Sequence, residues 1–144
     1  MLQTEREHKR CLPGVRIPDS ITISGDTANV INNADVLVLA VASPYTRSTA
    51  KLIAPFVKEG QIIVNVAKGV EEHTLLTLCQ IVEEEIPQAK VAVLSGPSHA
   101  EEVSRGIPTT CVIGAHEKNT AEYLQNIFMS DVFRVYTSPD MLGI

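Results

Sequence analysis

The stretch VAVLSGPSHAEEV, residues 91–103, contains the pattern that decides the fold. Its first four residues form an apolar run typical of a buried strand, and a Gly-Pro turn and a helix start follow. Ser98 is a favourable N-cap with Glu101 three positions later, so we predict a capping box here. Backbone N–H groups and small polar side chains then gather where an anion can bind, although a well-capped helix without a ligand explains the local pattern equally well.

The same arrangement occurs twice earlier in the chain. The apolar run VLVLAV, residues 36–41, leads to Ser43, and the run IIVNVA, residues 62–67, leads to Lys68. Strands that are apolar on both faces are typical of parallel sheets covered by helices on each side, which bind ligands beyond the carboxyl ends of their strands. We therefore predict an α/β, Rossmann-like fold with a doubly wound parallel sheet, in which Ser43, Lys68 and Ser98 lie along one edge.

Strand and helix patterns alternate from about residue 21 onward. The apolar runs predict strands near residues 21–24, 35–41, 61–67, 90–95, 109–114 and 132–136. Helical periodicity and capping residues predict helices near residues 26–33, 46–57, 73–86, 99–105 and 117–129, with Asp26 as the cap of the first. The glutamates at positions 83–85 are interpreted as a solvated helix face.

The first twenty residues differ in kind. Residues 1–20 are polar and interrupted by Leu12-Pro13-Gly14 and Ile17-Pro18, which predicts a connecting helix and an extended loop. Residues 21–144 are then interpreted as a partial dinucleotide-binding domain. The sequence contains no Gly-x-Gly-x-x-Gly motif, so the usual phosphate-binding turn of such a domain is missing.

Composition excludes several classes of protein. A chain of 144 residues with a net charge of −5 and no basic cluster lacks the surface that nucleic acids require. Its three cysteines and four histidines show no disulfide or metal-ligand spacing, so we expect neither a disulfide framework nor a metal site. No apolar run reaches the length of a membrane helix and the first residues are unlike a signal peptide, so we expect a cytoplasmic protein with no membrane partner.

Several segments together resemble the amino-terminal domain of bacterial NAD(P)-dependent glycerol-3-phosphate dehydrogenases. The matching segments cover nearly the whole chain and include Leu12-Pro13-Gly14, Ala34-Asp35-Val36, Ala67-Lys68-Gly69-Val70-Glu71, Leu94-Ser95-Gly96-Pro97-Ser98, Ala100-Glu101-Glu102-Val103, Gly106-Ile107-Pro108-Thr109 and Phe133-Arg134-Val135-Tyr136. The chain departs from the family pattern at Cys11, where an aromatic residue is usual, and at Val41-Ala42, where Val-Pro is usual.

The resemblance implies an oxidoreductase that interconverts sn-glycerol 3-phosphate and dihydroxyacetone phosphate with NAD or NADP and supplies a precursor of glycerophospholipids. It implies that Lys68 is catalytic and contacts both substrate and cofactor, since a cation there can polarise the ketone or balance the phosphate. Read from the residue alone, Lys68 is an ordinary exposed lysine. The implied substrate contacts are Lys68, Gly96 and Ser98, and the cofactor contacts are Lys68, Ala100, Ser43 and Tyr45.

The resemblance also implies that the chain is a fragment. The family's first strand, Gly-rich turn and second strand would precede Met1, and its proton-transferring lysine and helical substrate domain would follow Ile144. We therefore expect the chain alone to be inactive. The expected partners are a small phosphate substrate and further copies of the chain, with the strand at 36–41 as an open edge. Two alternatives stay open: another Rossmann dehydrogenase of a hydroxy acid or sugar acid, and a catalytically silent, self-associating module.

Overall fold

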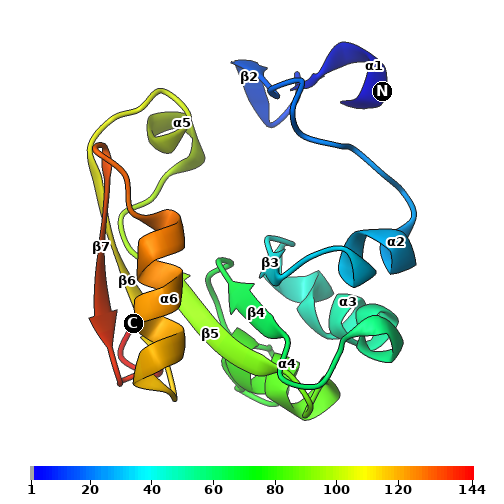
Figure 1. Cartoon of the computed structure of the whole chain (residues 1–144), viewed down its shortest axis with the longest axis vertical. Coiled ribbons are helices and arrows are strands. Elements are labelled where there is room, and N and C mark those ends of the chain that lie inside the picture. Colours follow the sequence, from blue (N-terminus) through cyan, green and yellow to red (C-terminus); the bar gives the residue numbers. More distant parts are fainter. Residues whose placement is uncertain (1) are drawn as a thin grey trace.

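A five-stranded sheet with helices on both faces forms the centre of the computed structural model, which describes residues 2–144 (Figure 1). In spatial order the strands are β3 (Val36–Leu39), β4 (Ile62–Asn65), β5 (Lys90–Ser95), β6 (Thr109–Ala115) and β7 (Phe133–Ser138). Sheet order therefore follows chain order, and every predicted strand from β3 onward is present close to its expected position.

The sheet changes direction once. β3, β4 and β5 are parallel, β6 runs antiparallel to β5, and β7 is parallel to β6. A parallel return needs a crossover, usually a helix over a face of the sheet. The connection to β6 contains only the one-turn helix α5 (Ala100–Val103), which lies beyond the end of the sheet (Figure 1). The doubly wound α/β fold is confirmed, and the prediction that every strand is parallel is corrected at β6.

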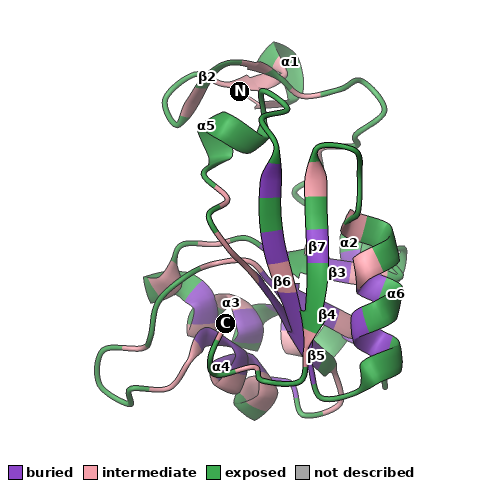
Figure 2. Cartoon of the chain, turned by 90° about the vertical axis from the view of Figure 1, so that its left-hand side faces the viewer, coloured by how far each residue is buried: buried purple, intermediate pink, exposed green. Residues whose placement is uncertain are grey.

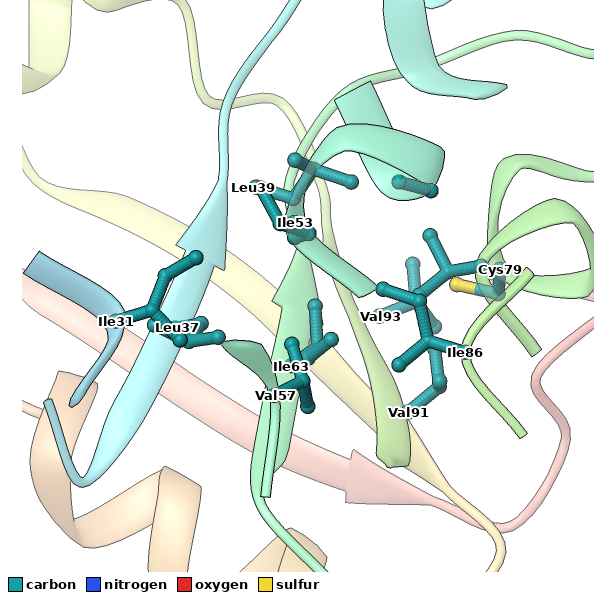
Figure 3. Close-up of a cluster of buried hydrophobic side chains, with 12 residues drawn as sticks. Ile31, Leu37, Leu39, Ile53, Val57, Ile63, Cys79, Ile86, Val91 and Val93 are labelled. Carbon is teal, nitrogen blue, oxygen red and sulfur yellow. The ribbon is translucent and has the colours of Figure 1, made fainter. Parts of the chain in front are cut away.

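One face of the sheet is covered by α2 (Thr27–Asn32), α3 (Thr46–Ile53) and α4 (Leu78–Glu85). Apolar side chains from these helices and from β3, β4 and β5 form the buried cluster in Figure 3, which includes Ile31, Leu37, Leu39, Ala50, Ile53, Ile63, Cys79, Val82, Ile86, Val91 and Val93. β4 and β5 bury side chains at successive positions, on both faces of the sheet, whereas β3 at the edge buries Leu37 and Leu39 on this face and leaves Val38 half exposed.

The opposite face is covered by α6 (Lys118–Phe128). Ala121 and Leu124 of this helix pack against a second buried cluster made of Val64, Ala92, Leu94, Cys111, Ile113, Ala115 and Val135. Figure 2 shows the result as buried segments along the strands and the inner sides of the helices, with exposed segments at the loops. The sheet thus separates two apolar cores.

Helix boundaries depend on local capping. Asp26 accepts a hydrogen bond from the Asn29 N–H at 3.1 Å, which confirms it as the cap of α2. α4 begins at Leu78 rather than near residue 73, because Thr77 forms a capping box with Gln80 and Leu75 has a left-handed φ of 58°. α3 ends at Ile53, and residues 54–57 continue it only as the short 3-10 helix η2 (Ala54–Phe56).

Residues 21–24 do not form the predicted strand. Their carbonyl groups bond to side chains instead of a neighbouring strand, since Ile21 accepts from Arg6 and Ile23 accepts from Gln3, at 2.8 and 2.9 Å. Ile21 remains half exposed. An alternating apolar pattern forms a strand only where a partner edge is available, and this segment has none.

The first residues form more structure than the predicted loop. α1 (Leu2–Glu5) is followed by β1 (Glu7–His8) and β2 (Leu12–Arg16), which pair as an antiparallel hairpin beyond one end of the main sheet (Figures 1 and 2). The Gly14 N–H donates to the Glu7 carboxylate at 2.8 Å and closes this hairpin. No helix between Leu2 and Ile144 is long and apolar enough to cross a membrane.

Candidate functional site

The carboxyl ends of β3, β4 and β5 meet at one edge of the sheet, because these strands are parallel. Ser43 follows β3, Lys68 follows β4 and Ser98 follows β5 by three residues. Ser43 and Gly69 are in contact, since a Cβ at Gly69 would lie 3.3 Å from the Cβ of Ser43. The predicted placement of Ser43, Lys68 and Ser98 along one edge is therefore confirmed.

A cleft of about 390 Å³ opens at this edge. It is lined by Asn65 and Lys68 from the end of β4, Ser95 from the end of β5, Thr77 and Cys79 from the start of α4, and the segment 141–144. A cleft of this size, with one cation and a few polar groups on apolar walls, is suited to a small polar molecule or part of a larger one.

Lys68 is the cation of this cleft. Its side chain is exposed, and its ammonium group has no hydrogen-bond or ion-pair partner among residues 2–144. A positive charge that no carboxylate neutralises is available to an anionic or polarised oxygen of a ligand. Lys68 is thus a free cation at this edge, and its implied role in catalysis and in substrate and cofactor binding stays a prediction.

Asn65 contributes a polar group that the sequence analysis missed. The residue is 2% exposed, and its Nδ2 donates to the Ala67 carbonyl at 2.9 Å, while its Oδ1 is buried without a hydrogen-bond partner. A buried acceptor without a donor is uncommon and costs free energy, so this oxygen is free to accept a hydrogen bond from a ligand group that enters the cleft. The signal in the sequence was the single amide within the apolar run IIVNVA.

Cys79 also lines the cleft but is not a nucleophile. Burial, with a smaller contribution from the Glu83 carboxylate, raises the pKa of the Cys79 thiol to about 12. The thiol therefore stays protonated near neutral pH, and only thiolates are strong nucleophiles. Cys79 contributes apolar packing to the wall of the cleft.

The turn after β5 differs from its prediction in detail. The N-cap of α5 is His99, without a side-chain hydrogen bond, so the predicted capping box at Ser98 and Glu101 is wrong. The Ser98 hydroxyl donates instead to the Gly96 carbonyl at 3.3 Å. Gly96 is required by packing, because a Cβ there would lie 2.6 Å from the Thr110 carbonyl oxygen of β6. The chain reverses here so closely that only a glycine fits.

The remaining predicted contacts lie outside the lining of the Lys68 cleft. Ala100 is exposed at the start of α5, and Tyr45 is 64% exposed in η1 (Ser43–Tyr45), the 3-10 helix that follows β3. The structure thus brings Ser43 and Lys68 together and leaves Ser98, Ala100 and Tyr45 further along the same edge. Their roles as ligand contacts stay predictions.

Residues 2–144 contain no group of three or more histidine, cysteine or acidic side chains arranged to hold a metal ion. His116 pairs with Glu83 at 2.7 Å, and His8 accepts from the Cys11 N–H at 3.0 Å. Cys11, Cys79 and Cys111 are all free thiols.

Arg47 is a second residue that sequence analysis missed. Its guanidinium bonds both carboxylate oxygens of Glu71 at 2.7 Å, and it also binds Glu84 and Glu85. The interpretation of the glutamates at 83–85 as a solvated face is therefore wrong for Glu85, whose side chain is 16% exposed, whereas Glu84 stays 57% exposed although it bonds Arg47. Hydrogen bonds from Arg47 first, and from Thr74 second, lower the pKa of Glu71 from its ordinary 4.5 to about 2.

The comparison with known families agrees with this arrangement. The family model described as NAD-dependent glycerol-3-phosphate dehydrogenase N-terminus matches residues 1–121. The chain belongs to this dehydrogenase family. The resemblance read from Lys68-Gly69 and Ser95-Gly96-Pro97-Ser98 is confirmed.

Curated relatives in the dehydrogenase family match the chain from end to end. It is 62% identical over 144 residues to a glycerol-3-phosphate dehydrogenase, NAD(P)+, of Agathobacter rectalis, and 53% identical over 145 residues to one of Fusobacterium nucleatum. The matches cover 100% and 99% of this chain but 43% of each relative. The chain thus spans less than half the length of these dehydrogenases.

Solved structures distinguish this family from other Rossmann enzymes. A glycerol-3-phosphate dehydrogenase of Coxiella burnetii matches with a TM-score of 0.91 at 25% identity, over 99% of this chain and 43% of that one. A pyrroline-5-carboxylate reductase of the same organism reaches a TM-score of 0.64 over 81% of this chain. The second match, at 17% identity, shows a shared fold only.

Proposed function

We propose that this chain supplies part of the cofactor and substrate site of an enzyme that interconverts sn-glycerol 3-phosphate and dihydroxyacetone phosphate with NAD or NADP. Membership of the dehydrogenase family supports the proposal, and the relatives carry this activity in their names. The single structural observation that carries it is the unpaired Lys68 ammonium at the carboxyl edge of parallel strands.

The residues at this edge fit a nicotinamide cofactor and a phosphorylated three-carbon substrate. Lys68 offers a positive charge to an oxygen that gains charge, and the buried Oδ1 of Asn65 offers an acceptor to an O–H or N–H group. Ser43 lies against Gly69 and Tyr45 is exposed two residues later, and both are proposed as cofactor contacts. A bound nicotinamide ring supplies or accepts the hydride.

In this reaction Lys68 has a defined task. During reduction of a ketone, negative charge develops on its oxygen, and an ammonium group held beside that oxygen stabilises it. During oxidation the same group orients the hydroxyl of the alcohol. Leu78 and Val93 line the same cleft with apolar surface, beside which an electrostatic interaction is stronger than in open water.

The wider context follows from the same assignment. We propose that the whole protein works in the cytoplasm, supplies a precursor for glycerophospholipid synthesis, takes a small phosphorylated substrate, binds neither nucleic acid nor membrane, and acts as a homo-oligomer. The free thiols at Cys11, Cys79 and Cys111 support a location in the cytoplasm. The net charge of −5 supports the proposal that the protein has no nucleic-acid partner.

The proposal is tested by grafting this chain into the Agathobacter rectalis relative in place of its matching segment. The graft should oxidise NADH or NADPH only when dihydroxyacetone phosphate is present, measured as loss of absorbance. The chain alone should show no turnover, because it spans 43% of that relative. A folded graft without activity would reject the proposal and favour a catalytically silent module.

A further inference from the structure

The side chain of Arg47 connects three segments of the chain. It is the second residue of α3, and its Nε and Nη2 bond the two oxygens of Glu71 at 2.7 Å in the loop after β4. Its Nη1 bonds Glu84 at 2.8 Å and also Glu85, both at the end of α4. The paired geometry at Glu71 fixes direction as well as distance, because the fork of a guanidinium matches a carboxylate.

The segment that carries Glu71 is closed on itself. Val70 and Thr77 form an antiparallel bridge, and the Glu71 N–H donates to the Leu76 carbonyl at 2.9 Å. The Leu75 N–H donates to the Glu71 carbonyl at 2.9 Å, and the Thr74 hydroxyl donates to the Glu71 carboxylate. Glu71 therefore connects both ends of the loop at residues 70–77, and a group that bonds its carboxylate restrains the whole loop.

The backbone is held by contacts on both sides of Lys68. On one side Asn65 donates to the Ala67 carbonyl at 2.9 Å, at the end of β4. On the other side Gly69 takes a φ of 128° against Ser43, and Glu71 follows two residues later. The Lys68 side chain itself has no partner among residues 2–144, so the backbone at Lys68 sets the region that its ammonium can reach.

We propose that Arg47 is a positioning residue which, by holding the Glu71 carboxylate, fixes the backbone at 68–70 and so places the Lys68 ammonium at the mouth of the cleft. The effect on the loop stands by itself, and its consequence for hydride transfer rests on the proposed function. Arg47 does not line the cleft, and Glu71 is its hydrogen-bond partner in the loop that follows Lys68.

The competing explanation is that Arg47 only joins α3 to α4. The two explanations can be tested separately, because different nitrogen atoms of Arg47 bond the loop and the helix. Glu71→Gln removes the carboxylate charge that Nε and Nη2 bond in the loop, and it leaves the bonds from Nη1 to Glu84 and Glu85. Glu84→Gln is the matched control. It removes the charge of one carboxylate that Arg47 bonds on α4, at an exposed position, and it leaves the bonds between Arg47 and Glu71 in place.

Hydrogen exchange and lysine modification of the full chain give the direct test. We expect Arg47→Ala and Glu71→Gln to speed amide exchange at residues 68–72 about tenfold and to change the rate at which an amine-reactive ester modifies Lys68. Arg47→Lys keeps the charge without the paired geometry and should restore part of the protection. Glu84→Gln should match wild type. Equal exchange in Glu71→Gln and wild type, or equal acceleration in Glu84→Gln, would overturn the proposal.

The graft into the Agathobacter rectalis relative gives the functional test. A displacement of about 1 Å costs up to about 100-fold in rate, so Glu71→Gln should lower kcat more than it raises KM for dihydroxyacetone phosphate. Arg47→Lys should restore part of kcat. An inactive wild-type graft rejects the proposed function, while hydrogen exchange still decides the positioning role. An active graft in which Glu71→Gln keeps full kcat overturns the positioning role and leaves the proposed function standing.

Discussion

Gly69 lies against Ser43 so closely that a Cβ added to the glycine would be 3.3 Å from the Cβ of the serine and 3.4 Å from its Oγ. The two residues belong to the loops after β3 and β4, and their contact joins the ends of neighbouring strands. The backbone of Gly69 adds a second constraint, because its φ of 128° is rarely adopted by residues with a side chain.

Gly69→Ala should therefore displace the Lys68 loop. The change combines a strained backbone with a crowded contact, so we expect a loss of about 1–3 kcal/mol in the free energy of unfolding. Gly25→Ala is the matched control, since no atom lies within 4 Å of its added Cβ and its φ is not positive. Urea unfolding of both variants measures the difference, and equal stability would show that the loop adapts without cost.

Gly96→Ala should destabilise the turn between β5 and β6. The added Cβ would lie 2.6 Å from the Thr110 carbonyl oxygen and 2.9 Å from the Cα of Cys111, both backbone atoms that cannot move alone. Overpacking of this kind costs about 1–3 kcal/mol. Thermal unfolding monitored by circular dichroism tests this, and an unchanged midpoint would contradict the close approach of the two strands.

Lys68→Ala should impair catalysis without impairing the fold. In the active graft, loss of a positioned donor for developing charge should raise the barrier by about 2.7–4 kcal/mol, which is a loss of about 100- to 1,000-fold in kcat. Lys118→Ala is the control, because its side chain is 86% exposed and lies at the start of α6. Full turnover after Lys68→Ala would return this residue to the class of ordinary surface lysines.

Acid should remove the stabilisation that Glu71 provides. Its pKa is lowered from 4.5 to about 2 in the folded chain, so the native state binds fewer protons than the unfolded state between these values. Its contribution is complete above about pH 5 and is lost as pH falls towards 2. The difference in unfolding free energy between wild type and Glu71→Gln should therefore shrink over this range, and a constant difference would exclude the charge of Glu71 as its source.

The exposed edge of β3 should support self-association. Val38 is half exposed, and the edge carries no lysine or proline between Val36 and Leu39 to discourage pairing. We expect dimers in which two copies pair along β3, measured by sedimentation equilibrium, and monomers after Val38→Lys. Tyr136→Lys at the opposite edge, where β7 already carries Arg134, should leave association unchanged. A monomer at high concentration would contradict this pairing.

Local sequence patterns predicted most of this architecture. The apolar runs at 36–41, 62–67 and 91–94 all form strands; the second and third are buried on both faces, and the first lies at the edge of the sheet with Val38 half exposed. Because the carboxyl ends of parallel strands share one edge of the sheet, the sequence alone predicted that Ser43 and Lys68 lie at the same edge. The family assignment followed from the short motifs in those loops.

Long-range relationships could not be predicted in this way. The reversal at β6 depends on α5 lying beyond the sheet, and nothing in the Gly96-Pro97 turn states the direction of the returning strand. Arg47 and Glu71 are 24 positions apart and belong to no common motif, so their pairing appears only when α3 packs beside the loop after β4. Asn65 had a visible signal, a polar residue in an apolar run, whose meaning depends on what surrounds it.

The separation of the two cores has a consequence for the interpretation of variants. Ile63 and Val64 are neighbours in β4, yet Ile63 belongs to the core under α2, α3 and α4, and Val64 to the core under α6. Truncations on opposite faces should add in free energy, whereas two truncations within one core should couple. Damage at Ile63 would thus loosen the layer that carries Arg47, while damage one residue later would reach α6 and spare it.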